Sequence, residues 1–204
     1  MADSRSRLIK GIVLAAGSSR RLGHPKQLLD LDGKLLIAHV VERCLASDLD
    51  DTIVVVGHEA GAVRHALTGM DVFFVFNSRY EEGQSTSLLA GLDAAGDADA
   101  IVVVLADQPG VEARAIDRLI ETRNEQRAAL AMTRYGERRG HPVLFGREYF
   151  GELRGVTGDQ GGREVLRRHT GVVVLIDGGS PEPPLDVDTA EDYARLRERH
   201  QRQM

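Results

Sequence analysis

The segment LAAGSSRRLGHPKQLL, residues 14–29, joins a turn of small side chains to three cationic ones. An apolar stretch ends in Leu14-Ala15-Ala16-Gly17, and Arg20, Arg21 and Lys26 follow within nine residues. Small side chains let a ligand approach the backbone N–H groups closely, and guanidinium and ammonium groups bind phosphate oxygens. The segment therefore predicts a site for a compact, strongly negative ligand. The alternative is an exposed basic loop with a glycine turn.

Two better-known phosphate-binding loops do not fit this segment. A Walker A loop requires Gly-Lys-Ser/Thr, whereas Gln27 follows Lys26 here. The dinucleotide fingerprint requires three closely spaced glycines, and only Gly17 and Gly23 are present. The pattern therefore argues against a P-loop NTPase and against a dinucleotide-dependent oxidoreductase.

Acidic residues follow two later stretches of strand-like sequence. Asp107 comes directly after AIVVVLA, and Asp186 and Asp188 flank Val187 before a helical segment. Carboxylates beside a strongly negative ligand would repel it unless a cation lies between them. Mg²⁺ suits this place because it takes oxygen ligands and bridges carboxylates to phosphates. The histidines and the one cysteine form no motif for a softer metal. Asp107 as a turn former and Thr189 as part of a capping box remain structural alternatives.

A second polar segment lies between a predicted strand and a predicted helix. Its amides, hydroxyls and glycine are those of Asn77, Gly83, Gln84, Ser85 and Ser87. Together with the Ala15-Ala16 backbone, these groups offer hydrogen-bond donors and acceptors to a ligand. Either serine is also a good residue to cap a helix that begins near Ser85.

Short apolar runs that alternate with helical patterns indicate the fold. The runs span residues 9–14, 52–56, 72–76, 100–105, 129–135, 141–145 and 172–176. They predict an α/β protein, a three-layer α/β/α sandwich with a mainly parallel sheet that binds ligands at the carboxyl ends of its strands. We expect one domain over residues 1–204. Its segment from about 134 to 170, rich in Gly and Arg, is expected to lie over the sheet edge and bind a second substrate.

Composition excludes several classes of partner. The net charge of −5 and the 4 % aromatic content argue against binding to nucleic acid or to an anionic membrane. No apolar run is long enough to span a bilayer, and the N-terminal residues lack the apolar core of a signal peptide, so we expect a cytoplasmic protein. The single cysteine, Cys44, is expected in a helix core.

Six motifs in order along nearly the whole chain resemble those of the MobA-like nucleotidyltransferases, which have a glycosyltransferase-A-type fold. LAAGSSRRLGHPKQLL resembles the signature loop, NSRYEEGQSTSLLAGL (77–92) the nucleoside segment, and LADQPGV (105–111) the metal-binding strand end. RGHPVLFG (139–146), TGDQGGREVL (157–166) and DVDTAEDY (186–193) are similar to motifs of the molybdenum cofactor cytidylyltransferase branch.

The resemblance implies that CMP is transferred from CTP to a phosphate of molybdopterin, with release of pyrophosphate. It implies Arg20, Lys26 and Asp107 as catalytic residues, and Asp107 with Asp188 as ligands of Mg²⁺. Asp186 is the less favoured ligand. The implied nucleoside contacts are Leu14, Ala15, Ala16, Gly17, Asn77, Gly83, Gln84, Ser85 and Ser87. Ala16 favours CTP because guanine-using relatives tend to carry LAGG at this place.

On the acceptor side, the resemblance suggests His141 and Arg163, while their roles and that of Asp159 stay open. Asp159 capping the helix that follows it, with Arg163 on that helix's exposed face, is the structural alternative. A recipient molybdoenzyme or its chaperone is the implied protein partner. The alternatives are the same reaction with GTP, a sugar phosphate or another cofactor precursor, and a non-catalytic carrier of the cofactor.

Overall fold

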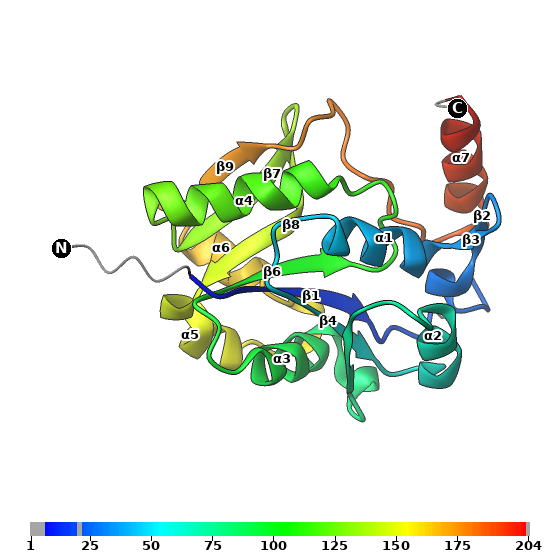
Figure 1. The fold of residues 1–204 in the computed structure, drawn as a ribbon, viewed down its shortest axis with the longest axis horizontal. Coiled ribbons are helices and arrows are strands. Elements are labelled where there is room, and N and C mark those ends of the chain that lie inside the picture. Colours follow the sequence, from blue (N-terminus) through cyan, green and yellow to red (C-terminus); the bar gives the residue numbers. More distant parts are fainter. Residues whose placement is uncertain (1–6, 20–21, 203–204) are drawn as a thin grey trace.

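The computed structural model describes residues 7–19 and 22–202, and a seven-stranded sheet forms its centre (Figure 1). The strands, in their order across the sheet, are β5 (Phe73–Phe76), β4 (Asp51–Val56), β1 (Ile9–Ala15), β6 (Ala100–Leu105), β8 (Arg138–Gly146), β7 (Leu130–Tyr135) and β9 (Val174–Asp177). Only β8 runs antiparallel to its neighbours, β6 and β7. The prediction of a mainly parallel sheet is therefore confirmed, and the strands lie within three residues of the predicted runs.

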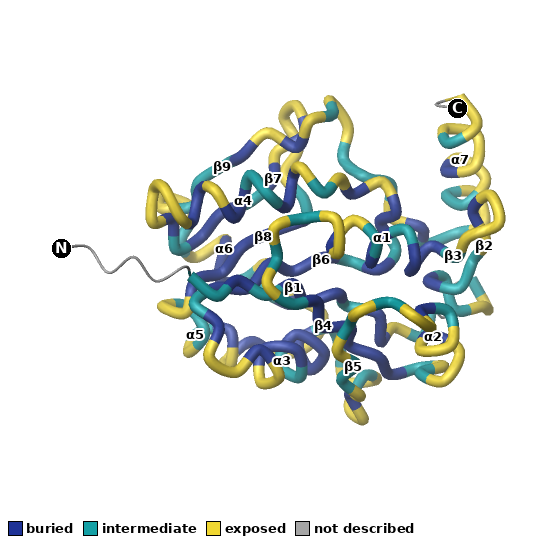
Figure 2. Tube along the Cα trace, viewed as in Figure 1, coloured by how far each residue is buried: buried dark blue, intermediate teal, exposed yellow. Residues whose placement is uncertain are grey.

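Helices cover both faces of this sheet. The helices α1 (Leu36–Leu45), α2 (Ala60–Ala66) and α4 (Ala113–Gln126) share one apolar core with the sheet. The second core contains residues of α3 (Gln84–Ala95), α5 (Phe150–Arg154) and α6 (Arg163–Arg168). Figure 2 shows the strands buried between these two layers and the outer helix faces exposed. The three-layer sandwich is confirmed, and Cys44 is buried on α1 as expected.

A third, small apolar cluster holds the segment that contains Asp186 and Asp188. The hairpin of β2 (Asp30–Leu31) and β3 (Lys34–Leu35) packs with the start of α7 (Ala190–Gln201) around Leu31, Val187 and Leu196. At the start of α7, Thr189 Oγ1 accepts a hydrogen bond from Asp192 N at 3.1 Å, and Asp192 Oδ2 accepts one from Thr189 N at 2.9 Å. The predicted capping box is present, and it holds the backbone next to Asp188.

The segment expected to lie over the sheet edge is divided between two layers. Its first part forms β8, whose apolar half is buried between β6 and β7, inside the sheet rather than over its edge. Its later part forms α5, the 3-10 helix η4 (Gly158–Gln160) and α6. Within the described ranges, no helix combines the length and the apolar character needed to cross a bilayer.

Candidate active site

The turn after β1 opens onto a cavity of about 370 Å³ at the carboxyl edge of the sheet. Parallel strands β1, β4 and β6 all end at this edge, so the loops that follow them meet here. The lining residues are Leu14, Ala15, Ala16, Gly17, Ser18, Lys26, Gln27, Tyr80, Glu81, Gly83, Gln84, Ser87, Leu105, Ala106, Asp107 and Asp159. Both predicted halves of the donor site, the small-residue turn and the polar segment, therefore line one cavity. Arg20, the other predicted phosphate-binding residue, lies outside the described residues.

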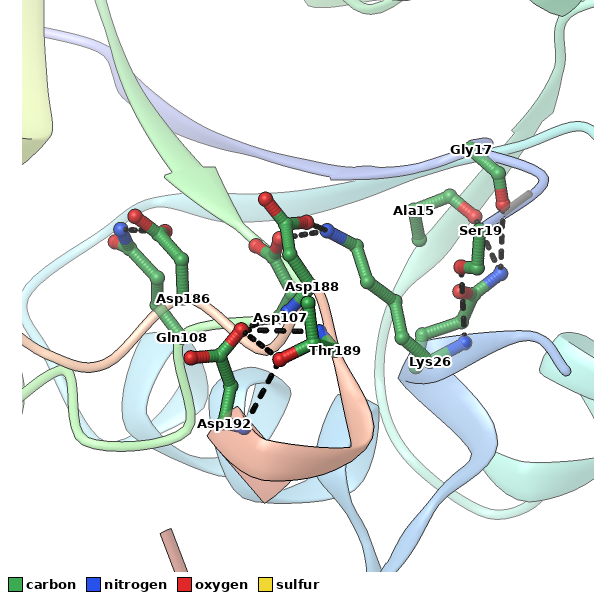
Figure 3. A network of polar contacts seen from close by, with 11 residues as sticks. Ala15, Gly17, Ser19, Lys26, Asp107, Gln108, Asp186, Asp188, Thr189 and Asp192 are labelled. Carbon is green, nitrogen blue, oxygen red and sulfur yellow. Dashed lines mark hydrogen bonds and ion pairs between the residues drawn. The ribbon is translucent and has the colours of Figure 1, made fainter. Parts of the chain in front are cut away.

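Lys26 lies between the two carboxylates that the sequence assigns to a metal ion (Figure 3). Its Nζ forms an ion pair with Asp107 and another, of 2.7 Å, with Asp188 Oδ1. Burial alone would lower the pKa of Lys26, but the two carboxylates outweigh it and raise the pKa above its ordinary value. The side chain is therefore a charged ammonium group at neutral pH. It joins Asp107 and Asp188, which lie far apart in the sequence.

A third carboxylate lies beside this cluster. Asp186 Oδ1 accepts a hydrogen bond of 2.6 Å from Gln108 Nε2, and the buried Gln108 Oε1 has no hydrogen-bond partner among the described residues. Burial raises the pKa of Asp186, and the nearby charge of Asp107 adds to the rise. Asp186 is thus held by a neutral amide, whereas Asp188 is held by an ammonium group.

The oxygen atoms of this cluster suit a hard divalent cation. The ammonium group of Lys26 shows that one cation can touch Asp107 and Asp188 together. Among the described residues, no three His, Cys, Asp or Glu side chains are grouped as a complete ligand set. Mg²⁺ and similar ions fit such a place, because they bind proteins through one or two carboxylates and take further oxygens from phosphates and water.

Most of the predicted nucleoside residues gather at the start of α3, but their roles differ. Asn77 is buried, and its amide donates to Thr86 Oγ1 at 2.9 Å and to Ser87 Oγ at 3.0 Å. Its Oδ1 accepts from Arg79 N, so this side chain holds the segment together. Gly83, Gln84 and Ser87 line the cavity, whereas Asn77 and the buried Ser85 do not. The contacts of these residues with a nucleoside stay a prediction.

Neither serine caps α3, and a distant aspartate takes that place. The residue before the helix is Gly83, and no side chain of the helix's own segment caps it. Asp159 Oδ1 instead accepts a hydrogen bond from Gln84 N at 3.3 Å, across 75 residues of sequence. Asp159 does not cap α6, the helix that follows it, which begins after Gly162 without a side-chain cap. The alternative in which Asp159 caps its own helix is therefore wrong.

A second cavity, of about 440 Å³, adjoins the first. Leu14 and Gln84 line both cavities. The walls of the second cavity are largely apolar, and three exposed arginines stand among them, with no Asp or Glu in the lining. The lining residues are Leu14, Gln84, Leu88, Val103, Met132, Arg139, Gly140, His141, Val143, Phe145, Gly162, Arg163, Leu166, Arg167, Thr170 and Val173. Such a site suits a flat or apolar ligand that carries negative groups.

His141 and Arg163, the two residues suggested for the acceptor side, both belong to this second cavity. Burial and, to a smaller extent, the positive charge of Arg163 lower the pKa of His141 to about 4. The imidazole is therefore neutral at physiological pH and can offer one donor and one acceptor to a ligand. The structure brings both residues together, 22 positions apart in sequence yet in one cavity.

Gln27 and Tyr80 also line the first cavity, although the sequence patterns did not assign them to the site. Gln27 is buried at the base of the turn, where it donates to two turn carbonyls. Tyr80 packs against Gly57 so closely that a β-carbon there would meet Tyr80 Cβ at 2.7 Å. The sequence shows that Gln27 follows Lys26 directly. It does not show where the side chain of Gln27 points, because spacing alone does not give side-chain direction in a short 3-10 helix.

Comparison with known proteins gives a consistent family. The MobA-like NTP transferase domain matches residues 11–172. A nicotine blue oxidoreductase from Paenarthrobacter nicotinovorans is 32% identical over 96% of this chain and 100% of its own length. The purine catabolism protein PucB from Bacillus subtilis (strain 168) is 30% identical over 95% of this chain and 98% of its own.

Solved structures agree with this assignment. A nucleotidyl transferase from Methanothermobacter is 28% identical, with a TM-score of 0.83 over 97% of this chain and 99% of its own. The manganese complex of Rv0371C from Mycobacterium tuberculosis H37Rv is 31% identical, with a TM-score of 0.77 over 94% of this chain and 98% of its own. A related protein of this fold thus binds a divalent cation.

Proposed function

Because the chain belongs to the MobA-like NTP transferase family and is a nucleotidyltransferase, we propose that it transfers CMP from CTP to a phosphorylated pterin, molybdopterin. The observation that carries this proposal is the cluster of Lys26, Asp107 and Asp188 in and beside a cavity that begins at the small-residue turn. A cationic lysine that can bind phosphate oxygens and two carboxylates that can hold a metal ion have an evident use next to a triphosphate. A protein that only stored the cofactor would not need them there.

The reaction requires one bond to form and one to break at the α-phosphorus of CTP. An ionised phosphate oxygen of the acceptor attacks this phosphorus, the bond to the β-phosphate oxygen breaks, and pyrophosphate leaves with the electron pair. The nucleophile arrives without a proton, so no general base is needed. Catalysis then depends on positioning the two substrates and on neutralising charge.

Each residue of the donor site has a role in this scheme. Lys26 and Arg20 bind the triphosphate and stabilise the charge that develops on the leaving group. Asp107 and Asp188 would hold Mg²⁺, which supplies positive charge between the carboxylates and the phosphates. The nucleoside lies between the 14–17 turn and the start of α3, with Gly83, Gln84 and Ser87 at its side. Asn77 and Ser85 support this segment from within.

CTP is the proposed donor because of the side chain at Ala16. This residue lines the first cavity, and its β-carbon packs near Gly57, where an added β-carbon would lie 2.9 Å from it. A methyl group at this position reduces the space for a purine. The expected discrimination is modest, about 1–3 kcal/mol, because one methyl group seldom separates two ligands by more.

The second cavity is the proposed acceptor site. A pterin is a flat ring system, and the apolar walls of this cavity fit such a ring while Arg139, Arg163 and Arg167 can bind its phosphate. Because Leu14 and Gln84 line both cavities, an acceptor phosphate in the second lies next to a nucleotide in the first. The proposal extends to a cytoplasmic site of action and to handover of the product to a recipient molybdoenzyme or its chaperone, which co-purification from cell fractions tests.

Pyrophosphate release measured over a matrix of donors and acceptors tests the proposal. We expect release with CTP, Mg²⁺ and molybdopterin, and much less with GTP or with a sugar phosphate as acceptor. Asp107→Asn should abolish the signal, which rules out a contaminating activity. Tight cofactor binding without pyrophosphate release would instead identify a carrier. Since one relative is named as an oxidoreductase, NAD(P)H oxidation should be measured in parallel, and a redox activity alone would overturn the proposal.

A further inference from the structure

The second residue of the Lys26-Gln27 pair points away from the carboxylates and into the protein. Gln27 is only 3% exposed, although glutamine is polar. Its Nε2 donates to Ala15 O at 3.3 Å and to Gly17 O at 3.4 Å. Figure 3 shows both acceptors beside Lys26 and Ser19. The same short 3-10 helix, η1 (Lys26–Leu28), thus carries one side chain toward the acidic cluster and the next toward the turn.

These two hydrogen bonds complete a pattern that covers the whole turn. Leu14 O accepts from Ala106 N at 3.2 Å, and Ala16 O accepts from His58 N at 3.1 Å. With the two bonds from Gln27, every carbonyl of residues 14–17 is bound by a group of the protein. No hydrogen bond joins the N–H groups of residues 16–18 to any part of the chain that the structure describes.

The turn therefore has a defined polarity. Its carbonyl groups accept hydrogen bonds from other parts of the protein. Its N–H groups can therefore donate to a ligand in the cavity that residues 16–18 line. A set of backbone N–H groups that all face one way attracts anionic or carbonyl oxygens. An apolar residue at position 27 would take the side-chain donor away from both carbonyls, and a buried polar group that loses a partner is costly. Each of those carbonyls would then be drawn toward water in the cavity.

We infer that Gln27 is a positioning residue for nucleotide binding: it holds the carbonyls of the turn inward, so that the N–H groups of residues 16–18 face the nucleotide. The inference rests on the proposed function, because it takes the ligand of this cavity to be a nucleotide. A second contact fixes the same register, since Ser19 Oγ accepts from Lys26 N at 3.0 Å. The phosphate-binding lysine and the nucleoside-binding turn are thereby held at a constant spacing.

Two variants separate this role from a general contribution to folding. Gln27→Met keeps the length of the side chain but removes the donor, and Gln27→Glu puts an acceptor where the donor was. Thr122→Val is the matched control, because it removes a buried hydrogen bond, from Thr122 Oγ1 to Arg118 O, on α4 and outside the cavity. Binding of CTP with Mg²⁺ is measured by calorimetry without acceptor, and backbone hydrogen exchange is followed over residues 14–19.

Both Gln27 variants should bind CTP at least about tenfold more weakly. The reason is that they lack the two hydrogen bonds from Gln27 Nε2 that hold the turn in place. Thr122→Val should lose about as much thermal stability as the Gln27 variants but should bind CTP as tightly as the wild type. In turnover assays the KM for CTP should rise, whereas the KM for the acceptor should not. In the wild type, CTP should slow exchange of the N–H groups of Ala16 and Gly17, a result that needs no variant.

The outcomes distinguish the inference from the function on which it rests. If the wild type binds no nucleoside triphosphate, the proposed function fails and the inference falls with it. If the wild type binds CTP but both Gln27 variants bind it equally well, only the inference is overturned. If the variants do not fold, unchanged exchange of the Ala16 and Gly17 N–H groups on CTP binding to the wild type would overturn it as well.

Discussion

Replacing Lys26 by methionine should have opposite effects on turnover and on metal binding. In the structure the ammonium group contacts Asp107 and lies 2.7 Å from Asp188 Oδ1. It thus occupies the place between the carboxylates where we propose that a divalent cation binds. A triphosphate would attract both cations, but in its absence the lysine and the metal compete for the same oxygens. Methionine has a similar length and no charge, so it removes both the competitor and the phosphate ligand.

The two effects differ in size. Loss of one group that stabilises the transition-state charge typically costs about 2.7–4 kcal/mol, so turnover should fall about 10²–10³-fold. The ion pairs are partly open to solvent, since the side chain of Lys26 is 21% exposed and that of Asp188 48%. Each pair is therefore worth about 1 kcal/mol at most. Release of both should tighten metal binding by the free protein by about 1–2 kcal/mol, a factor of about 5–30.

Manganese binding measured by electron paramagnetic resonance, without nucleotide, checks the second effect directly, and pyrophosphate release checks the first. The matched control is Lys10→Met, because Lys10 forms a comparable pair with Asp51 of 2.9 Å at the start of β1, far from the cavity. That variant should leave both quantities unchanged. Normal turnover of Lys26→Met would remove the lysine from the mechanism. An unchanged or weaker affinity for Mn²⁺ would refute competition between the lysine and the metal.

Three further perturbations test the rest of the site. Asp188→Asn should lower both turnover and Mn²⁺ affinity by at least about tenfold, and Asp186→Asn should lower both less. Pyrophosphate release and Mn²⁺ binding measure the two effects. A larger loss in Asp186→Asn than in Asp188→Asn would assign the metal to Asp186. Arg163→Ala should raise the KM for the acceptor about tenfold and leave the KM for CTP unchanged, with Arg114→Ala on the outer face of α4 as the control in steady-state kinetics. His141 has a pKa lowered to about 4, below its ordinary 6.5, so the unfolded chain takes up its proton first as the pH falls. Proton uptake by His141 on unfolding should therefore reduce the free energy of unfolding by about 2 kcal/mol between pH 7 and pH 5. Urea titrations at several pH values should show that His141→Gln lacks this part of the pH dependence.

The elements of this fold were readable from the sequence because the central strands are buried on both faces. Such strands are almost wholly apolar, as in Ala100–Leu105, and their ends are marked by the polar residues that form the site. Asp107 follows β6 at the edge where the parallel strands end, so its place beside the turn was expected. The strand-like stretch before Asp188 does not form a strand, yet Asp188 still reaches this edge, where Lys26 contacts both carboxylates. A local pattern also identified the capping box of Thr189, since its partner is three residues away.

Long-range side-chain contacts could not be predicted in the same way. The bond from Gln84 N to Asp159 crosses 75 residues, and neither residue alone indicates its partner. The use of Asn77 as an internal brace depends on where Thr86 and Ser87 fall on the first turn of α3. Placement of β8 inside the sheet follows from pairing with β6, which a strand pattern does not specify. Each of these features depends on tertiary geometry rather than on local spacing.

The contact between α3 and the 158–162 loop argues that the donor and acceptor cavities are one unit. Gly83 has a φ of 111°, and a β-carbon there would lie 2.5 Å from the carbonyl carbon of Gly158. A β-carbon at Gly161 would likewise lie 2.7 Å from Gln84 Oε1. Only glycines allow the loop to approach so closely, and the approach brings Asp159 to the first cavity while Gly162 and Arg163 line the second. A ligand that moves this loop from one cavity therefore changes the wall of the other, so the affinities for the two substrates should depend on each other.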